Sequence, residues 1–265
     1  IDRWQEIFEA IGKNKLRTFL TGLSVASGIF ILVILLGFSS GIQNGVKTQF
    51  ENDAVNSIAI RTRVTTKEYK GLNPGRRIQL RNDDFTEINN AYEDQLEYKT
   101  AIYNMWGSEV IFEGETGSYR LEGANPDQQF IENASLVSGR FLSQDDMNET
   151  RKVAIIGNII KEDLFKGKDP IGEIISIFGV KFKVVGVYTD PGGSREEGSV
   201  VVPLTTEQIA FNGGDKVRSL AYTVKMSDNF DEAVALSTAL SENIEQDIKS
   251  KYIVAPDDRS AVRVN

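Results

Sequence analysis

The amino-acid sequence reads FLTGLSVASGIFILVILLGF over residues 19–38, inside a longer run, residues 18–46, that has no charged side chain. A helix of twenty residues is about 30 Å long, which is the thickness of the hydrocarbon core of a bilayer. Lipid offers no hydrogen-bond partner to backbone groups, so a lone segment of this length crosses a membrane only as an α-helix. The run therefore predicts one transmembrane helix.

Basic residues on one side of the run indicate its orientation. Lys13, Lys15 and Arg17 precede it, whereas the first basic residue after it is Lys47. Positive charge is retained on the cytoplasmic side, so we expect a cytoplasmic N-terminus and an extracytoplasmic chain after about residue 46. A secretory signal peptide, cleaved near residues 39–41, is the alternative, but the apolar run is longer than a signal peptide's usual apolar core.

Residues 1–17 predict an amphipathic helix on the cytoplasmic side. Its apolar side chains, among them Trp4, Phe8 and Ile11, recur at helical spacing and gather on one face. Such a face either lies in the membrane interface or packs on a partner protein. We interpret it as the surface that receives motion from a partner.

Small residues within residues 18–46, the predicted transmembrane helix and start of a stalk, recur every four positions. Gly37, Gly41 and Gly45 would stack on one helix face, where another membrane helix can approach closely. Local bending of the helix is the other reading of the same glycines.

Composition excludes several classes of function. The chain of 265 residues carries a net charge of −8. Residues 1–17 hold four basic and three acidic side chains, a net charge of +1, so the predicted extracytoplasmic part carries −9. A surface this acidic disfavours nucleic acid. The chain has neither Cys nor His, which removes disulfides, thiol chemistry and the commonest zinc ligand and general base. We predict no catalytic residue, no metal site and no cofactor site.

Four acidic doublets are the remaining candidates for acid–base chemistry. Each lies in a predicted turn or helix start, and we expect no basic or histidine partner for any of them. We therefore interpret them as solvated caps: 83/84, 145/146, 196/197 and 257/258.

Hydrophobic periodicity predicts an α+β fold beyond the stalk. A helix is expected over 84–91, capped by Asn82 or Asp83, and another begins at Asn229. Glycines at 114 and 117 mark one turn, Gly179 marks a second, and residues 190–197 form a long loop. Strands are expected over residues 57–64, 97–112, 118–123, 152–157, 173–178, 180–187, 198–202 and 219–225.

Five blocks of sequence resemble the MacB-type permeases of ATP-binding cassette (ABC) transporters, in the order of that family. They are NKLRTFLTGLSVASGI (14–29), SGRFLSQDD (138–146), KVAIIG (152–157), LFKGKDPIGEIISIFGVKFKVVGV (164–187) and VVVPLTT (200–206). The resemblance implies an inner-membrane subunit with a periplasmic α/β Porter-like subdomain, residues 47–130 and 215–265, and an inserted β-rich Sabre-like subdomain, residues 131–214.

The same resemblance implies partners. These are an ABC ATPase that binds ATP, a second permease copy or paralogue, and either a periplasmic adaptor or a lipoprotein carrier. It also implies three further transmembrane helices after Asn265. The sequence has no GxxxxGK[ST] motif, so the ATPase is expected on a separate chain or upstream of Ile1.

The predicted function is a permease subunit that couples cytosolic ATP hydrolysis to movement of its periplasmic domain, for efflux or for lipoprotein or peptide export. In this mechanotransmission, Trp4, Phe8 and Ile11 contact the ATPase. Gly192, Gly193 and Arg195 lie in a loop that meets a partner or substrate; the loop is either mobile or an anion-binding nest. A membrane-anchored binding or sensing module without transport is the alternative function.

The orientation is tested by thiol labelling, because the chain has no native cysteine. We expect a membrane-impermeant thiol reagent to label Ser194→Cys in intact spheroplasts and to leave Asn14→Cys unlabelled until the membrane is permeabilised. The reversed pattern would place the N-terminus outside.

Overall fold

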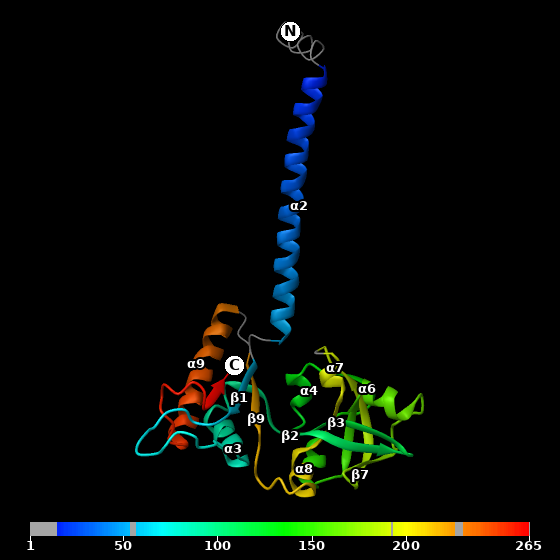
Figure 1. Cartoon of the computed structure of the whole chain (residues 1–265), viewed down its shortest axis with the longest axis vertical. Helices are drawn as coiled ribbons and strands as arrows, with labels where there is room; N and C mark the ends of the chain where they lie inside the picture. The colour runs from blue at the N-terminus through cyan, green and yellow to red at the C-terminus, as the bar shows by residue number, and fades with distance from the viewer. Residues whose placement is uncertain (1–14, 54–56, 192, 226–229, 265) are drawn as a thin grey trace. The chain divides into compact units, whose positions relative to one another are not determined.

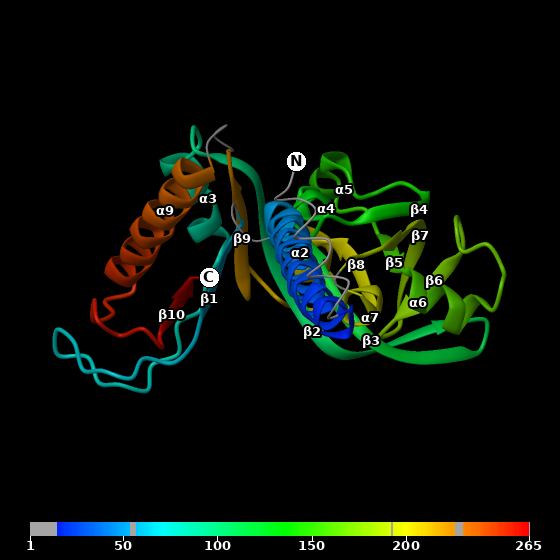
Figure 2. The ribbon, with the colours of Figure 1, turned by 90° about the horizontal axis from the view of Figure 1, so that it is seen from above.

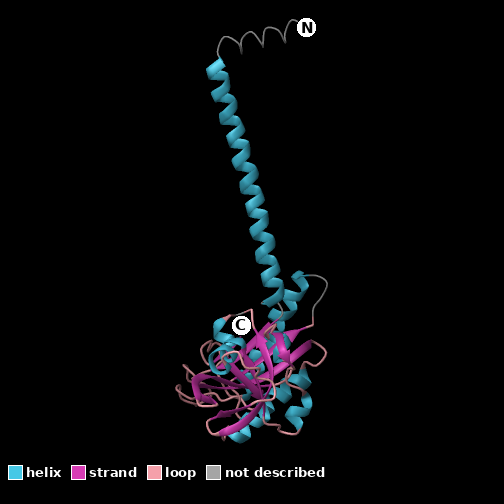
Figure 3. Cartoon of the chain, turned by 90° about the vertical axis from the view of Figure 1, so that its right-hand side faces the viewer, coloured by secondary structure: helices cyan, strands magenta, loops and turns pink. Residues whose placement is uncertain are grey.

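The computed structural model describes residues 15–53, 57–191, 193–225 and 230–264. The chain divides into two compact units, Ile1–Asn52 and Asp53–Asn265, and each is described here by itself. The described part of the first unit is α2, Lys15–Asp53, which is one uninterrupted helix of 39 residues (Figure 3). This confirms the predicted helix through the apolar run, and the helix continues past it to Asp53.

The second unit contains a sheet of ten strands among its described residues. One part of it, which we call the first lobe, is an antiparallel sheet of β10 (Val262–Val264), β1 (Ser57–Thr62), β9 (Ser219–Val224) and the start of β2 (Leu96–Phe112). Two helices, α3 (Asn82–Ala91) and α9 (Phe230–Lys251), pack on it. In Figures 1 and 2, α9 lies on one side of β9 and the second lobe of the unit lies on the other side.

A core of apolar side chains joins these helices to the sheet. Ile58 and Ile60 of β1 alternate with more exposed neighbours, as expected of a strand with one covered face. Leu240, Ile244 and Ile248 follow at helical spacing on α9 and pack into the same core. The strand and the helix pack together because each has one apolar face, and these two faces bury each other.

The second lobe is a closed ring of strands. β2 pairs with β3 (Glu115–Ala124), β3 with β8 (Ser199–Pro203), β8 with β5 (Val153–Gly157), β5 with β7 (Val180–Thr189), β7 with β6 (Ile174–Ile177), and β6 returns to β2. Side chains such as Phe112, Phe182 and Ile156 fill its interior. β4 (Ser135–Gly139) pairs with β7 outside the ring.

Two tight turns support the ring. β2 and β3 are joined by Glu113 and Gly114, both at positive φ, which is the two-residue turn that matches the twist of paired strands. Phe178 and Gly179 join β6 and β7 in the same way. The turn predicted at Gly179 is confirmed, whereas Gly117 lies inside β3 and not in the turn.

Other predicted details differ from the structure. The N-cap of α3 is Arg81, not Asn82 or Asp83, because the Asp84 carboxylate accepts from the Arg81 backbone N–H at 2.7 Å. The loop after β7 contains a helical turn, α7 (Ser194–Glu197). The remaining short elements are α4 (Gln128–Ile131), α5 (Gln144–Asn148), α6 (Asn158–Ile160), the π-helix η1 (Lys161–Phe165) and α8 (Leu204–Ala210).

The two cores divide the chain at other residues than the predicted subdomain boundaries. Val110, Phe112 and Leu121, which the sequence placed in the first subdomain, fill the ring. Met147 and Leu204, from the segment predicted for the second subdomain, pack in the first core. The chain crosses between the lobes within β2 because this strand is long enough to serve both.

Candidate functional site

The apolar part of α2, Phe19–Phe38, has no buried residue. Phe30 and Phe38 expose about two thirds of their surface. A helix that is apolar all round is stable only in lipid or against other helices. The helix is therefore long and apolar enough to cross a bilayer, as predicted.

The glycines predicted to pack in the membrane lie on this helix. No atom lies within 4 Å of where a Cβ of Gly37 would be. Gly41 and Gly45 have helical backbone, but their surroundings fall outside the described residues. Packing of another helix on these three positions stays a prediction.

The other predicted site residues are placed only in part. Trp4, Phe8, Ile11 and Gly192 lie outside the described residues. Gly193 has φ of +84°, and its N–H donates to the Asp190 carbonyl at 3.0 Å; Arg195 falls in α7. The role of this loop in meeting a partner stays a prediction.

The structure brings together three of the sequence blocks quoted above. In α8, the Thr206 hydroxyl donates to the Arg151 carbonyl at 2.9 Å and the Thr205 hydroxyl to the Met147 carbonyl at 2.8 Å. Next to them, Ile155 of β5 pairs with Val201 of β8. We call this region, residues 138–157 and 200–206, the inter-lobe junction, because Met147 packs in the first core while β5 and β8 belong to the ring.

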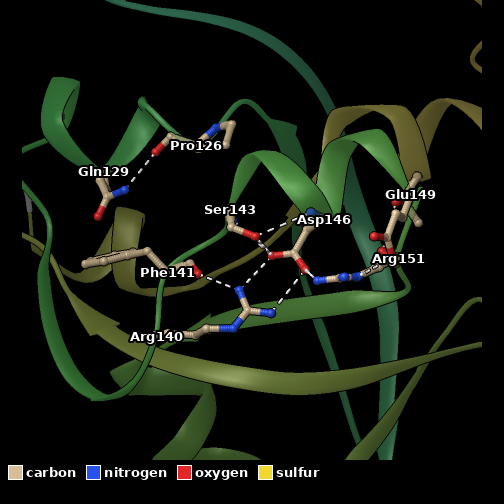
Figure 4. Close-up of polar contacts among 9 residues, drawn as sticks. Pro126, Gln129, Arg140, Phe141, Ser143, Asp146, Glu149 and Arg151 are labelled. Atoms are coloured by element: carbon tan, nitrogen blue, oxygen red, sulfur yellow. Dashed lines mark hydrogen bonds and ion pairs between the residues drawn. The ribbon is translucent and has the colours of Figure 1, made fainter.

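Asp146 is the buried charge at the centre of the junction (Figure 4). It forms a two-pronged ion pair with Arg140, at 2.6 and 3.0 Å, and a longer one with Arg151 at 3.4 Å. The backbone N–H and the hydroxyl of Ser143 also donate to it, at 2.9 and 3.0 Å. Every acceptor position of the carboxylate is therefore matched by a donor.

These contacts fix the protonation state of Asp146. Burial by itself would raise its pKa, but hydrogen bonds from Arg140 and Ser143 outweigh this and lower the pKa to about 2. The carboxylate is ionised at neutral pH and ties the segment after β4 to the segment before β5. The junction is thus held by charge-assisted hydrogen bonds as well as by apolar contacts.

The prediction that all four acidic doublets are solvated caps without basic partners is wrong. Asp84 is 2% exposed and pairs with Lys251 at 2.6 Å, and Asp146 is fully buried between two arginines. Asp258 is 1% exposed and accepts from Thr66, whose N–H lies at 2.7 Å. The partners of Asp84 and Asp258 are distant in the sequence, so a local pattern could not reveal them.

Glu207 of α8 is a buried acid without an ion-pair partner among the described residues. It is fully buried against Gly123 of β3, where any Cβ would overlap its carboxyl group, and only the backbone N–H of Gly123 opposes the effect of burial on its pKa. Burial raises its pKa to about 8. Sequence reasoning missed it; the only local signal is a glutamate inside the otherwise uncharged stretch VVVPLTTEQIA.

Comparison with known proteins identifies relatives over most of the chain. Residues 18–240 match the model of the MacB-like periplasmic core domain. The macrolide export ATP-binding/permease protein MacB of Bdellovibrio bacteriovorus is 23% identical over 228 residues, covering 85% of this chain and 35% of that protein. MacB of Chlorobaculum tepidum is 24% identical over 266 residues, covering 98% and 39%. The chain thus spans little more than a third of these relatives.

Solved structures show the same fold. The periplasmic region of MacB from Actinobacillus actinomycetemcomitans superposes with a TM-score of 0.65 at 17% identity, covering 82% of this chain and 91% of that one. The extracellular domain of the ABC-type transporter YknZ from Gram-positive bacteria superposes with a TM-score of 0.63 at 16% identity, covering 79% and 100%. The predicted α+β fold, an N-terminal apolar helix followed by Porter- and Sabre-like parts, is confirmed.

Replacing Asp146 tests the junction. Asp146→Asn should lower the free energy of unfolding of the second unit at pH 7 by roughly 2–3 kcal/mol, because it leaves two arginines without their carboxylate. The wild-type contribution is present above the unfolded pKa near 4 and is lost as the pH falls through about 2. Urea unfolding measures the difference; Asp145→Asn, on the exposed neighbour, is the control and should change little.

Replacing Glu207 tests the buried acid. Because the folded-state pKa is raised from 4.5 to about 8, wild-type stability should fall as the pH rises between these values, by up to about 5 kcal/mol in total. Glu207→Gln should remove this part of the pH dependence, measured by urea unfolding across that range. An unchanged pH profile would mean that Glu207 is solvated; Glu97→Gln, on an exposed glutamate, is the matched control.

Proposed function

The chain belongs to the family of the MacB-like periplasmic core domain, and from this we propose that it is the membrane-anchored periplasmic part of an ABC transporter permease. In this proposal a separate ATPase hydrolyses ATP in the cytosol, and the permease converts that event into movement of the periplasmic domain. We also propose that the permease assembles with a second copy of itself or with a paralogue in the same membrane. The domain itself transmits force and carries no catalytic step.

The observation that carries the proposal is the continuity of α2. Its 39 residues form one hydrogen-bonded rod about 58 Å long, of which Phe19–Phe38 accounts for about 30 Å. The remaining length extends beyond the hydrocarbon core. A displacement applied at the cytoplasmic end of such a helix is therefore passed to its outer end and is not absorbed by a loop.

The receiving body is suited to move as one piece. The long strand β2 contributes to both cores, and the inter-lobe junction adds the buried Asp146 ion pairs. A body held in this way responds to a push by displacement more than by internal deformation. The amphipathic face of Trp4, Phe8 and Ile11 remains our proposed contact with the ATPase.

The transported compound is proposed from the relatives alone. Proteins that match most of this chain are named macrolide export proteins, which favours efflux over the export of lipoproteins or peptides. A periplasmic adaptor would then be a partner, whereas a lipoprotein carrier would accompany the alternative. The alternative function, membrane-anchored binding or sensing without transport, would hold if no ATPase acts together with this chain.

Breaking α2 tests the lever. In the full-length permease with its ATPase, Val46→Pro should uncouple ATP hydrolysis from transport, because proline removes a backbone N–H and destabilises the helix interior by about 3 kcal/mol or more. Transport and ATPase rate are measured in the same proteoliposomes. Val46→Ala keeps the helix and should transport normally. Full transport by Val46→Pro would refute the lever and leave the family assignment intact.

A further inference from the structure

The second lobe contains a cavity that the proposed lever does not use. It is partly open to solvent, and its inner part has room of about 40 Å³, enough for a few water molecules or one ammonium group. Residues of β3, α4, β5, β7 and β8 and of the loop after β7 line it. Phe141, which is drawn beside the inter-lobe junction in Figure 4, lines the cavity together with Pro126 and Gln129.

The polar side of the cavity gathers carboxylates around one amide. Nε2 of Gln128 donates to Oε1 of Glu122 and to Oε1 of Glu132, both at 3.1 Å. The two carboxylate oxygens are therefore at most about 6 Å apart, which follows from the two bonds to a common atom. Asp190 and Glu196 line the same cavity.

One described cation faces these acids. Arg120 lies 3.5 Å from Glu122, but its Nε donates to the Ser199 hydroxyl at 2.8 Å and its guanidinium lies over the Trp106 ring. Its charge offsets that of one carboxylate. Among the described side chains that line the cavity, negative charge is thus in excess.

An unused acceptor lies in the same wall. Gln128 is 8% exposed, and its Oε1 has no hydrogen-bond partner. The amide nitrogen donates to both Glu122 and Glu132, and the oxygen is left without a donor. A buried acceptor without a donor is unfavourable unless a ligand or water supplies one.

The pKa values of Glu122 and Glu132 are raised in this crowded cluster of acids. Burial, followed by the charges of Glu196 and Asp190, raises the pKa of Glu122 against the opposing effect of Arg120. Loss of hydration, followed by the charge of Glu122, raises the pKa of Glu132 to about 7, although part of that residue is exposed at the rim. A cation placed between them would favour their ionised forms.

The rest of the lining includes apolar side chains, which indicate the kind of cation that fits. Among them are Phe141, Leu142, Ile155 and Val201. Among the described residues, no three His, Cys, Asp or Glu side chains lie close enough together to hold a metal ion, so we consider an organic cation. Apolar side chains beside excess acceptors fit a cation with N–H donors and a hydrocarbon body.

We propose that this cavity binds a protonated primary amine, whose ammonium group is held by Glu122, Glu132 and the Gln128 Oε1 and whose hydrocarbon chain lies on these apolar side chains. Three N–H donors match the acceptors that the wall leaves in excess. The inference concerns binding and does not depend on transport. It assigns the ligand by chemistry: an alkylammonium group, from a small molecule or from a lysine side chain.

The test is calorimetric titration of the chain in detergent micelles at pH 8 with n-butylammonium chloride. We expect saturable binding, with n-butanol and butyrate binding at least tenfold more weakly because they lack the charge or reverse it. Glu122→Gln should weaken butylammonium binding about tenfold or more. Glu132→Gln should weaken it too, and Glu97→Gln should leave it unchanged.

A pH series separates recognition of charge from a structural effect. Affinity should fall as the pH is lowered through about 7, where Glu132 takes up a proton. Glu132→Gln should flatten this fall, while thermal unfolding checks that each variant is folded. Tighter binding of Nα-acetyl-lysine amide than of butylammonium would support the same site with a polypeptide as the source. Equal binding of butanol, or unchanged affinity in both Gln variants, would overturn the proposal.

Discussion

The structure of the periplasmic unit depends on one strand that serves two cores. Leu96 and Ala101 of β2 pack with α3 and α9, whereas Val110 and Phe112 fill the ring. Between them the pairing shifts from β9 to β3, with an irregularity between Met105 and Ser108 and Gly107 at φ of +69°. A strand cannot slip by one residue without turning its side chains to the other face, so fixing β2 in one core fixes it in the other.

Closure of the ring pairs strand edges that β2 alone would leave open. A sheet that closes on itself leaves fewer unpaired edges, and β6 closes it with only two paired positions on β2, Val110 and Ile111. Asp146 then joins the segments that enter the ring to those that reach the first core. Backbone pairing sets the shape, and the buried ion pair ties the lobes at a second place away from β2.

Local sequence determined the elements well and their partners poorly. The long apolar run predicted α2, alternation predicted β1, and the short apolar run KVAIIG predicted β5, because these signals depend on neighbouring residues. The pairing of β6 with β2, which closes the ring, joins residues more than 60 positions apart in the sequence. The ion pair of Asp84 with Lys251 joins residues that are even further apart in the sequence. Glu122 lies in a strand that reads YRLEGA, where its burial depends on α4 covering it, which no pattern predicts.

Three buried acids show how the same residue type serves different roles. Asp146 is matched by two arginines and stays ionised. Glu207 has no described ion-pair partner and is favoured in its neutral form, and Glu122 has one arginine beside it among other acids around a cavity. The first contributes stability and the second costs it. The third is connected to the first, because Arg140, which holds Asp146, also donates to the carbonyl of the cavity residue Phe141 at 2.9 Å. The backbone of this cavity residue and the buried carboxylate that joins the two lobes are thus held by the same guanidinium group.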